Sequence, residues 1–220
     1  MAKKKLKIDR LWLIVILLVP SVLLNVFLLV RERTILDQGV KVEGVIDGDT
    51  LVLEGKGKIR LRYADAPELE YCGGREAKDY LEKLVVGRKV TIKEQIPDQY
   101  GRGMALVWRG RTLINKAMLV SGWSRYHHDN SDLTKELKET AAMAIEEKLG
   151  IFGKCQSKDI PDKEGCTIKG NIDNNNKTRI YYLPGCSQYN FTVVEKDMGE
   201  AWFCTEKEAK KAGFRKAKTC

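Results

Sequence analysis

The sequence has little of several features that define common classes of catalytic and metal-binding protein. It contains only two histidines, His127 and His128, and neighbours on a strand point to opposite faces, so the two cannot form a catalytic pair. Its six cysteines include no Cys-x-x-Cys, the usual spacing of a zinc site. Acidic residues are fewer than basic ones, 30 against 39, which gives a formal net charge of +9. This charge is compatible with a polyanionic partner but does not establish one.

One long apolar run stands out near the N-terminus. It covers residues 11–30, LWLIVILLVPSVLLNVFLLV, and a helix of about 20 apolar residues is long enough to span a bilayer. A cluster of basic residues precedes the run, and only Arg31 and Arg33 follow it closely. The positive-inside rule then keeps the N-terminus in the cytoplasm. We predict a basic tail and a single-pass transmembrane signal anchor over residues 1–35, with the rest of the chain extracytoplasmic at the cell membrane.

A cleaved signal peptide, which would yield a secreted protein, is the competing interpretation of this run. Signal peptides have a shorter apolar core that ends in a small-residue cleavage site. The segment VFLLVRER offers no such site, so we favour the uncleaved anchor.

The chemically most informative stretch follows, VIDGDTLVLEGKGKIRLRYADAPE. Its two apolar runs are typical of strands, and the segment GKG joins them as a hairpin. If the strands pair, Asp49 at the end of one strand lies close to Asp65 and Glu68, which follow the end of the other. Arg60 then lies within this second strand. Carboxylates beside arginines indicate a hard cation and an anionic substrate.

Four motifs in this region resemble those of the staphylococcal nuclease (thermonuclease) family. They are Asp47-Gly48-Asp49-Thr50, Arg60, Asp65-Ala66-Pro67-Glu68 and Tyr100-Gly101-Arg102-Gly103. The resemblance extends over residues 40–152. It implies an α+β fold for a domain at 38–155, with a five-stranded OB-type barrel and three helices. In two departures from the family pattern, Ala66 replaces a threonine and Gln99 replaces a lysine that lies beside the substrate phosphate.

The resemblance also implies a role for each motif residue. A Ca²⁺ ion would be held by Asp49, Asp65 and the backbone carbonyl of Ala66. Asp47 would not bind the ion itself but would orient the residues that do. The charge on the reacting phosphate would be met by Arg60 and Arg102. The attacking water would be oriented or deprotonated by Glu68, and Tyr100 would contact the substrate. Because the family uses only the carbonyl of the threonine, we expect Ala66 to serve equally well.

The function implied is that of a calcium-dependent endonuclease. It would hydrolyse phosphodiester bonds of DNA and RNA with little sequence specificity and leave 3′-phosphate ends, since an OB-type groove binds single strands through backbone charge and stacking. A non-catalytic nucleic-acid-binding or envelope module on the same fold is the alternative. Members of that kind lose the acids or arginines, which this chain keeps. We expect a monomer.

The cysteines indicate a second, smaller region. We predict a disulfide between Cys72 and Cys155, a linker at 156–165 and a small module at 166–220. The module resembles the zinc-binding domain of the Ada methyl-DNA repair protein, although Ala217 stands where that domain has a cysteine. For its own cysteines we favour disulfides over zinc, because the chain lies outside the cytoplasm. These are Cys166, Cys186, Cys204 and Cys220. The lysine-rich C-terminal end suggests contact with nucleic acid or a cell-wall polymer.

Overall fold

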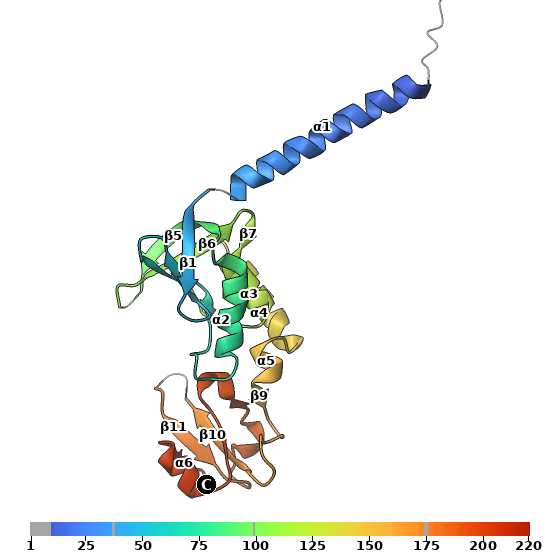
Figure 1. The fold of residues 1–220 in the computed structure, drawn as a ribbon. Helices are drawn as coiled ribbons and strands as arrows, with labels where there is room; N and C mark the ends of the chain where they lie inside the picture. The colour runs from blue at the N-terminus through green and yellow to red at the C-terminus, as the bar shows by residue number, and fades with distance from the viewer. Residues whose placement is uncertain (1–9, 37, 99, 174–175) are drawn as a thin grey trace, which may run out of the picture.

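The computed structural model describes residues 10–36, 38–98, 100–173 and 176–220, without the side chains of 10–16, 35 and 36. The first element, α1 (Arg10–Leu36), projects away from the rest of the molecule (Figure 1). The predicted basic tail lies outside the described residues, and the predicted anchor lies partly outside the described side chains. Within the part of the chain that is described, no helix has both the length and the apolar character needed to cross a membrane.

Five strands after α1 close into a small barrel. They are β1 (Val40–Val45), β2 (Thr50–Leu53), β3 (Lys58–Leu61), β5 (Lys89–Pro97) and β6 (Gly103–Arg109). Antiparallel pairing joins neighbours in the order β3-β2-β1-β5-β6, and a parallel pairing of β3 with β6 closes the ring. The short β7 (Thr112–Leu113) extends the sheet beyond β6. The expected α+β fold with a five-stranded ring is therefore present.

The β2–β3 hairpin sets the position of the acidic and basic motif residues. Its loop contains Gly55 and Lys56 with left-handed φ values of 84° and 68°, and the backbone N–H of Leu53 closes it by donating to the carbonyl of Gly57 at 2.8 Å. The resulting register places Thr50 opposite Arg60. The backbone N–H of Leu61 then donates to the carbonyl of Asp49 at 2.8 Å. The hairpin predicted from the sequence is confirmed.

Helices cover one side of the barrel (Figure 1). They are α2 (Gly74–Val85), α3 (Ile114–Val120), α4 (Thr134–Glu146) and the short α5 (Ile151–Lys154). On α2 the buried residues Ala77, Leu81 and Val85 recur at helical spacing, so one face packs on the barrel core. The predicted helices are present, and α5 adds a short fourth one.

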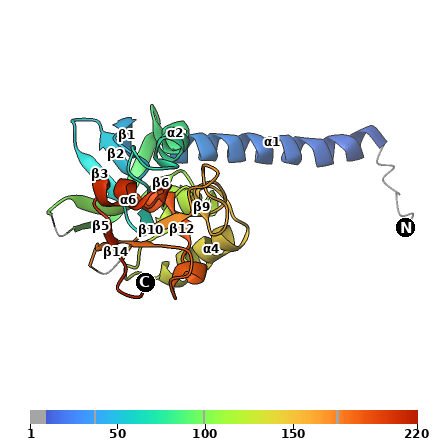
Figure 2. The same cartoon turned by 90° about the horizontal axis from the view of Figure 1, so that it is seen from below.

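The C-terminal module has its own sheet and its own core. The sheet order is β13-β10-β11-β14, and the strands are β10 (Ile168–Ile172), β11 (Arg179–Tyr182), β13 (Trp202–Phe203) and β14 (Arg215–Lys216). Helix α6 (Glu206–Lys211) and two 3-10 turns, η1 (Tyr189–Phe191) and η2 (Lys196–Met198), complete it. Turned by 90°, the module lies in front of the barrel while α1 extends to one side (Figure 2).

The predicted linker at 156–165 begins with ordered structure. Its first two residues form β9 (Gln156–Ser157), which pairs with β12 (Val194–Glu195) of the module. The short strand pair ties the two parts of the chain together directly after α5. Two further elements, β4 (Ala64–Asp65) and β8 (Arg125–Tyr126), pair with each other at the edge of the barrel that faces the module.

All six cysteines are in disulfides, and their pairs are Cys72–Cys155, Cys166–Cys204 and Cys186–Cys220. The predicted bridge across the nuclease-like domain and the preference for disulfides in the module are confirmed. The zinc alternative is wrong for these four thiols, because each sulfur is consumed in a bridge. The resemblance to the Ada domain receives no support from this arrangement.

Reduction should therefore weaken the module, whose core cluster contains six buried apolar residues among those described. Loss of a native bridge in a small domain typically costs about 2–5 kcal/mol of unfolding free energy. We expect thiol titration of the unfolded, unreduced protein to find no free sulfur, and reductant to lower the denaturant midpoint of the module. One bound Zn²⁺ per chain together with reactive thiols would contradict this prediction.

Candidate active site

Asp49 is the most deeply buried acidic group of the motif region, with 1% of its surface exposed. One of its carboxylate oxygens accepts a hydrogen bond from the Thr50 hydroxyl at 2.8 Å, and the other accepts the backbone N–H of Ala66 at 3.0 Å. Burial raises the pKa of Asp49 to about 7, although the charge of Arg60 opposes this rise. Burial therefore favours the neutral form of this carboxyl, and a neighbouring positive charge favours its ionised form.

Arg60 supplies part of that charge and links two acids. Its Nη2 lies 2.7 Å from Oδ2 of Asp49 and also donates to Oδ1 of Asp65. Burial alone would lower the pKa of Arg60, but Asp49 and Asp65 raise it overall. The guanidinium is therefore always charged, and its remaining N–H groups are available to an anionic substrate.

A sharp reversal of the chain brings Asp65 back beside Arg60. The reversal uses Arg62 and Tyr63, and Tyr63 has a φ of 66°, a left-handed value that is unusual for a bulky residue. The Tyr63 hydroxyl donates to Oγ of Ser131 at 2.8 Å, which holds the strained turn in place. Strand β4 then returns along β8, with Asp65 opposite Arg125.

Two glycines hold the acidic loops close together. A Cβ on Gly48 would lie 2.6 Å from the Cβ atoms of Ala66 and Ala77, and a Cβ on Gly74 would lie 2.0 Å from the carbonyl oxygen of Glu68. No side chain fits at either position. Gly48 belongs to the Asp-Gly-Asp motif, so the sequence indicates its importance. No motif marks Gly74.

Asp47 closes the first of these loops by accepting the backbone N–H of Asp49 at 3.1 Å. It thus holds the backbone of the loop that carries Asp49. Glu68 lies in the second loop, is exposed, and accepts the N–H of Tyr71 through its backbone carbonyl at 2.9 Å. Its carboxylate is therefore presented to solvent by a fixed backbone.

An open pocket of about 410 Å³ lies over the barrel next to these acids. Four of the predicted site residues line it, namely Arg60, Asp65, Tyr100 and Arg102. Ala66 and Glu68 are not in its wall and line a second pocket instead. The structure thus divides these residues between two neighbouring cavities, and Asp47 and Asp49 line neither of them.

Arg102 belongs to a tight turn between β5 and β6. Its Nε donates to Asp98 at 2.5 Å, and its guanidinium carbon lies 5.2 Å from the centre of the Tyr100 ring. Just over half of the side chain, 54%, is exposed, so the two terminal nitrogens can bind an anion in the pocket. Asp98 was not predicted as a site residue. Gln99 lies outside the described residues.

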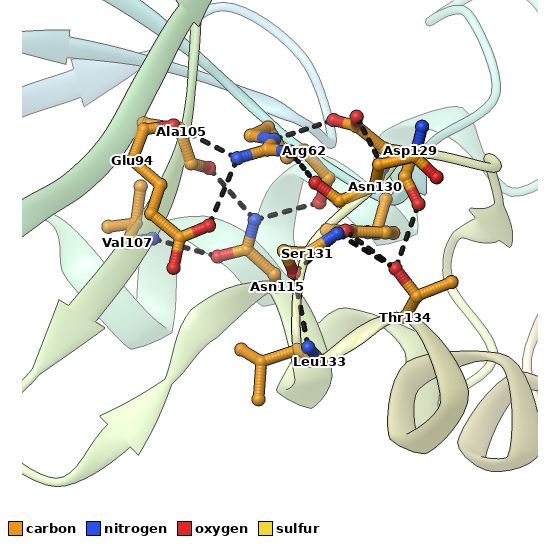
Figure 3. Close-up of polar contacts among 11 residues, drawn as sticks. Arg62, Glu94, Ala105, Val107, Asn115, Asp129, Asn130, Ser131, Leu133 and Thr134 are labelled. Carbon is orange, nitrogen blue, oxygen red and sulfur yellow. Dashed lines mark hydrogen bonds and ion pairs between the residues drawn. The ribbon is translucent and has the colours of Figure 1, made fainter.

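A buried polar network supports the opposite wall of this pocket (Figure 3). Nε of Arg62 donates to Asp129 at 2.5 Å, and its terminal nitrogens donate to the carbonyls of Glu94 and Asn130, both at 3.1 Å. Asn115 is fully buried and donates to the carbonyl of Arg62 at 2.8 Å. The Arg62 charge lowers the pKa of Asp129 through this hydrogen bond.

This network fixes the segment that carries His127, whose exposed side chain lines the 410 Å³ pocket with Asp129. His128 lies beside it and makes a ring contact with Tyr126. The sequence-based prediction did not include Arg62 and Asp129, because a single arginine or aspartate forms no recognisable motif. Their importance follows only from the burial of Arg62 at 4% exposure.

The donor groups fit a hard cation such as Ca²⁺. Among the residues described, no three His, Cys, Asp or Glu side chains gather closely enough to hold a metal by themselves. Two carboxylates, Asp49 and Asp65, share one guanidinium, however, so a further cation would balance their charge. Calcium takes oxygen ligands, including backbone carbonyls and water, to complete its shell.

Charged nitrogen donors around an open pocket, next to paired carboxylates, are the chemistry of a phosphodiester-cleaving site. Comparison with known proteins agrees with this class. Residues 58–154 match the family model described as staphylococcal nuclease homologue. This part of the chain is therefore similar to the staphylococcal nuclease family.

Individual relatives support the same domain. The chain is 29% identical over 129 residues to the thermonuclease of Staphylococcus hyicus, a match covering 53% of this chain and 76% of that protein. It is 34% identical over 97 residues to an uncharacterized endonuclease of Haemophilus influenzae, covering 40% and 54%. It is 43% identical over 75 residues to a probable endonuclease of Yarrowia lipolytica, covering 30% and 33%.

The last two matches span less than two thirds of the relatives' own lengths. The similarity therefore concerns this domain.

Proposed function

We propose that the protein is a calcium-dependent nuclease that hydrolyses phosphodiester bonds of DNA and RNA. The observation that carries this proposal is the contact of Arg60 with both Asp49 and Asp65 at the edge of the pocket that Arg102 also lines. Two acids and two arginines in this arrangement match a cation and a phosphate. The names of the relatives support the same activity.

In this mechanism the protein positions the phosphate and stabilises the charge that develops on it. Water attacks phosphorus, the P–O5′ bond breaks, and the products carry a 3′-phosphate and a 5′-hydroxyl. The five-coordinate transition state carries more negative charge on its oxygens than the substrate does. Arg60 and Arg102 stabilise this charge and so lower the barrier to hydrolysis. Glu68 orients the water or takes its proton.

Ca²⁺ would be held by Asp49, Asp65 and the carbonyl of Ala66, with Asp47 holding the loop that carries Asp49. When bound, it would add positive charge at the reacting phosphate. Tyr100 is exposed in the same pocket and offers a ring to a base or sugar, a contact that tolerates any sequence. We therefore expect the protein to cleave nucleic acids with little sequence specificity.

Removal of calcium gives the first test of this proposal. The chain from Gln38 onward should degrade single-stranded DNA and RNA with Ca²⁺ and stop in EGTA, because Asp49 and Asp65 are then left without their cation. The 3′ ends of the products should accept a label only after 3′-phosphatase treatment. Equal activity in EGTA would remove the metal assignment, and tight binding of DNA without any cleavage would favour the alternative of a non-catalytic binding module.

We further propose that the N-terminal segment anchors the protein in the cell membrane, with the nuclease-like domain outside the cytoplasm. The apolar run in the sequence supports this, and so do the exposed apolar side chains of α1 between Leu17 and Val30. The three disulfides support an oxidising compartment. Secretion after cleavage is the alternative. We expect the protein to act as a monomer.

The basic end of the module supports a second, weaker role in holding an anionic polymer. Arg215, Lys216 and Lys218 line a hollow of about 400 Å³ on the module. The polymer would be nucleic acid or a component of the cell wall, and the contact would be sensitive to salt.

A further inference from the structure

The C-terminal module is docked on the nuclease-like domain through buried, charged and backbone contacts. Nε of Arg125 lies 2.6 Å from Oδ2 of Asp197, whose side chain is fully buried, and Nη2 of Arg125 lies 3.1 Å from Glu195. The backbone N–H of Lys196 donates to the carbonyl of Cys155 at 2.9 Å. Burial of such a pair fixes the relative orientation of the partners, because its separation would leave a charge unpaired.

Close packing accompanies these contacts. A Cβ on Gly199 of the module would lie 2.7 Å from the ring of Tyr71, so the tyrosine rests directly on the module backbone. Tyr71 follows Glu68 by three residues, and its N–H is bonded to the Glu68 carbonyl. The module therefore packs against the loop that carries Glu68.

A second pocket, of about 200 Å³, lies where these two parts meet. The nuclease-like domain contributes Asp65, Glu68 and Tyr71 to its wall, and the module contributes Lys177, Asp197 and Met198. Asp65 lines the 410 Å³ pocket as well. The two pockets are thus neighbours that meet at Asp65.

This division locates the reacting phosphate of the proposed nuclease. Arg60 and Arg102 line the first pocket, and Glu68 lines the second. A phosphate that is held by the arginines while its attacking water contacts Glu68 must lie at the boundary, beside Asp65. A substrate strand in the first pocket then continues toward the second.

Lys177 is the cation in the second pocket that can meet this strand. Arg125 also lines the pocket but is paired with Asp197 and Glu195. Lys177 is exposed, and among the described residues it makes no ion pair. Its backbone is held by the hairpin between β10 and β11, where its N–H donates to the carbonyl of Asp173 at 2.8 Å. A fixed backbone thus presents a lysine toward a cavity whose other wall is acidic.

We propose that Lys177 binds a backbone phosphate of a single-stranded nucleic acid that extends past Asp65 into the second pocket. The module then forms part of the substrate-binding site, and it favours substrates long enough to reach it. This inference rests on the proposed nuclease function. It also explains why the end of the module that carries the β10–β11 hairpin faces the nuclease-like domain (Figure 1).

The test compares variants of the full chain that differ by one charge. Lys177 has a φ of 56°, a left-handed value that asparagine tolerates, so Lys177→Asn removes the charge with little strain. Lys177→Arg keeps the charge. The matched control is Lys148→Asn, because Lys148 is an exposed lysine with a φ of 53° that lines neither pocket.

Turnover is measured on a 20-nucleotide single-stranded DNA and on a chromogenic phosphodiester of a single nucleotide. We expect Lys177→Asn to raise KM for the long substrate about 3- to 10-fold with kcat unchanged, and to reduce the slope of log affinity against log salt by about 0.7, the value for one phosphate contact on a single strand. The chromogenic substrate, Lys177→Arg and Lys148→Asn should show wild-type values.

Binding of the labelled 20-mer in EGTA, followed by fluorescence anisotropy, separates this inference from the proposed function. If the wild-type chain cleaves nothing, the nuclease proposal fails, and the anisotropy still decides on Lys177. If Lys177→Asn binds as tightly as Lys148→Asn at low salt, the phosphate contact is refuted. An equal loss on both substrates would also refute it, since it would indicate a disturbed active site.

Discussion

Replacement of Arg60 by alanine should lower kcat on single-stranded DNA on the order of 100- to 1,000-fold, the scale for loss of one donor to a charged transition state. Arg60 contacts both Asp49 and Asp65, so its loss also leaves two neighbouring carboxylates without their shared cation. The phosphate and the two acids would then repel one another more strongly. Steady-state kinetics over a range of substrate concentrations gives kcat and KM separately.

Two further variants define the role of Arg60. Arg60→Lys keeps the charge but loses the planar fork, and we expect it to recover only a small part of kcat. Arg88→Ala is the control, since Arg88 is exposed and lines neither pocket, and it should behave as wild type. A rise in KM alone for Arg60→Ala would make Arg60 a substrate-binding residue and overturn the role proposed here.

Replacement of Glu68 by glutamine should reduce kcat on the order of 100- to 10,000-fold, the range for loss of a general acid or base. The amide keeps the shape of the side chain but cannot accept a proton from water. Glu68 is exposed and lines the second pocket, so the substitution should leave the fold intact. Calorimetric titration with Ca²⁺ should give nearly the wild-type affinity.

The control for this variant is Glu70→Gln, which removes an exposed acid two positions away that lines neither pocket. It should retain full turnover. Loss of calcium binding in Glu68→Gln would identify Glu68 as a metal ligand, and unchanged turnover would exclude it from the reaction.

Local patterns predicted a large part of the fold. The glycine-containing turn and the alternation of apolar and basic residues were enough to predict the hairpin that places Thr50 opposite Arg60. The buried residues Ala77, Leu81 and Val85 of α2, which recur at helical spacing, are a local signal of the same kind. These features depend on contacts between residues close in sequence, and such contacts leave a periodic signal. The barrel itself came from the family resemblance, because its closure depends on the long-range pairing of β3 with β6.

The disulfides show the limit of local patterns. Four cysteines in the module allow three sets of pairs, and sequence alone cannot choose among them. The register of β10 with β13 decides, because Ile168 lies opposite Phe203 and so brings Cys166 next to Cys204. The remaining pair, Cys186–Cys220, follows.

The sequence by itself determined which acids and arginines make up the candidate site, since their types and spacing match a known family pattern. Only the tertiary structure decided that Arg62 supports one wall of the first pocket and that Lys177 lies across the second pocket from Glu68. Arg62 binds Asp129 across 67 positions of the chain, and Lys177 lies between β10 and β11, two strands of another sheet. Contacts of this range depend on how finished elements pack against one another, and no spacing within the chain encodes that packing.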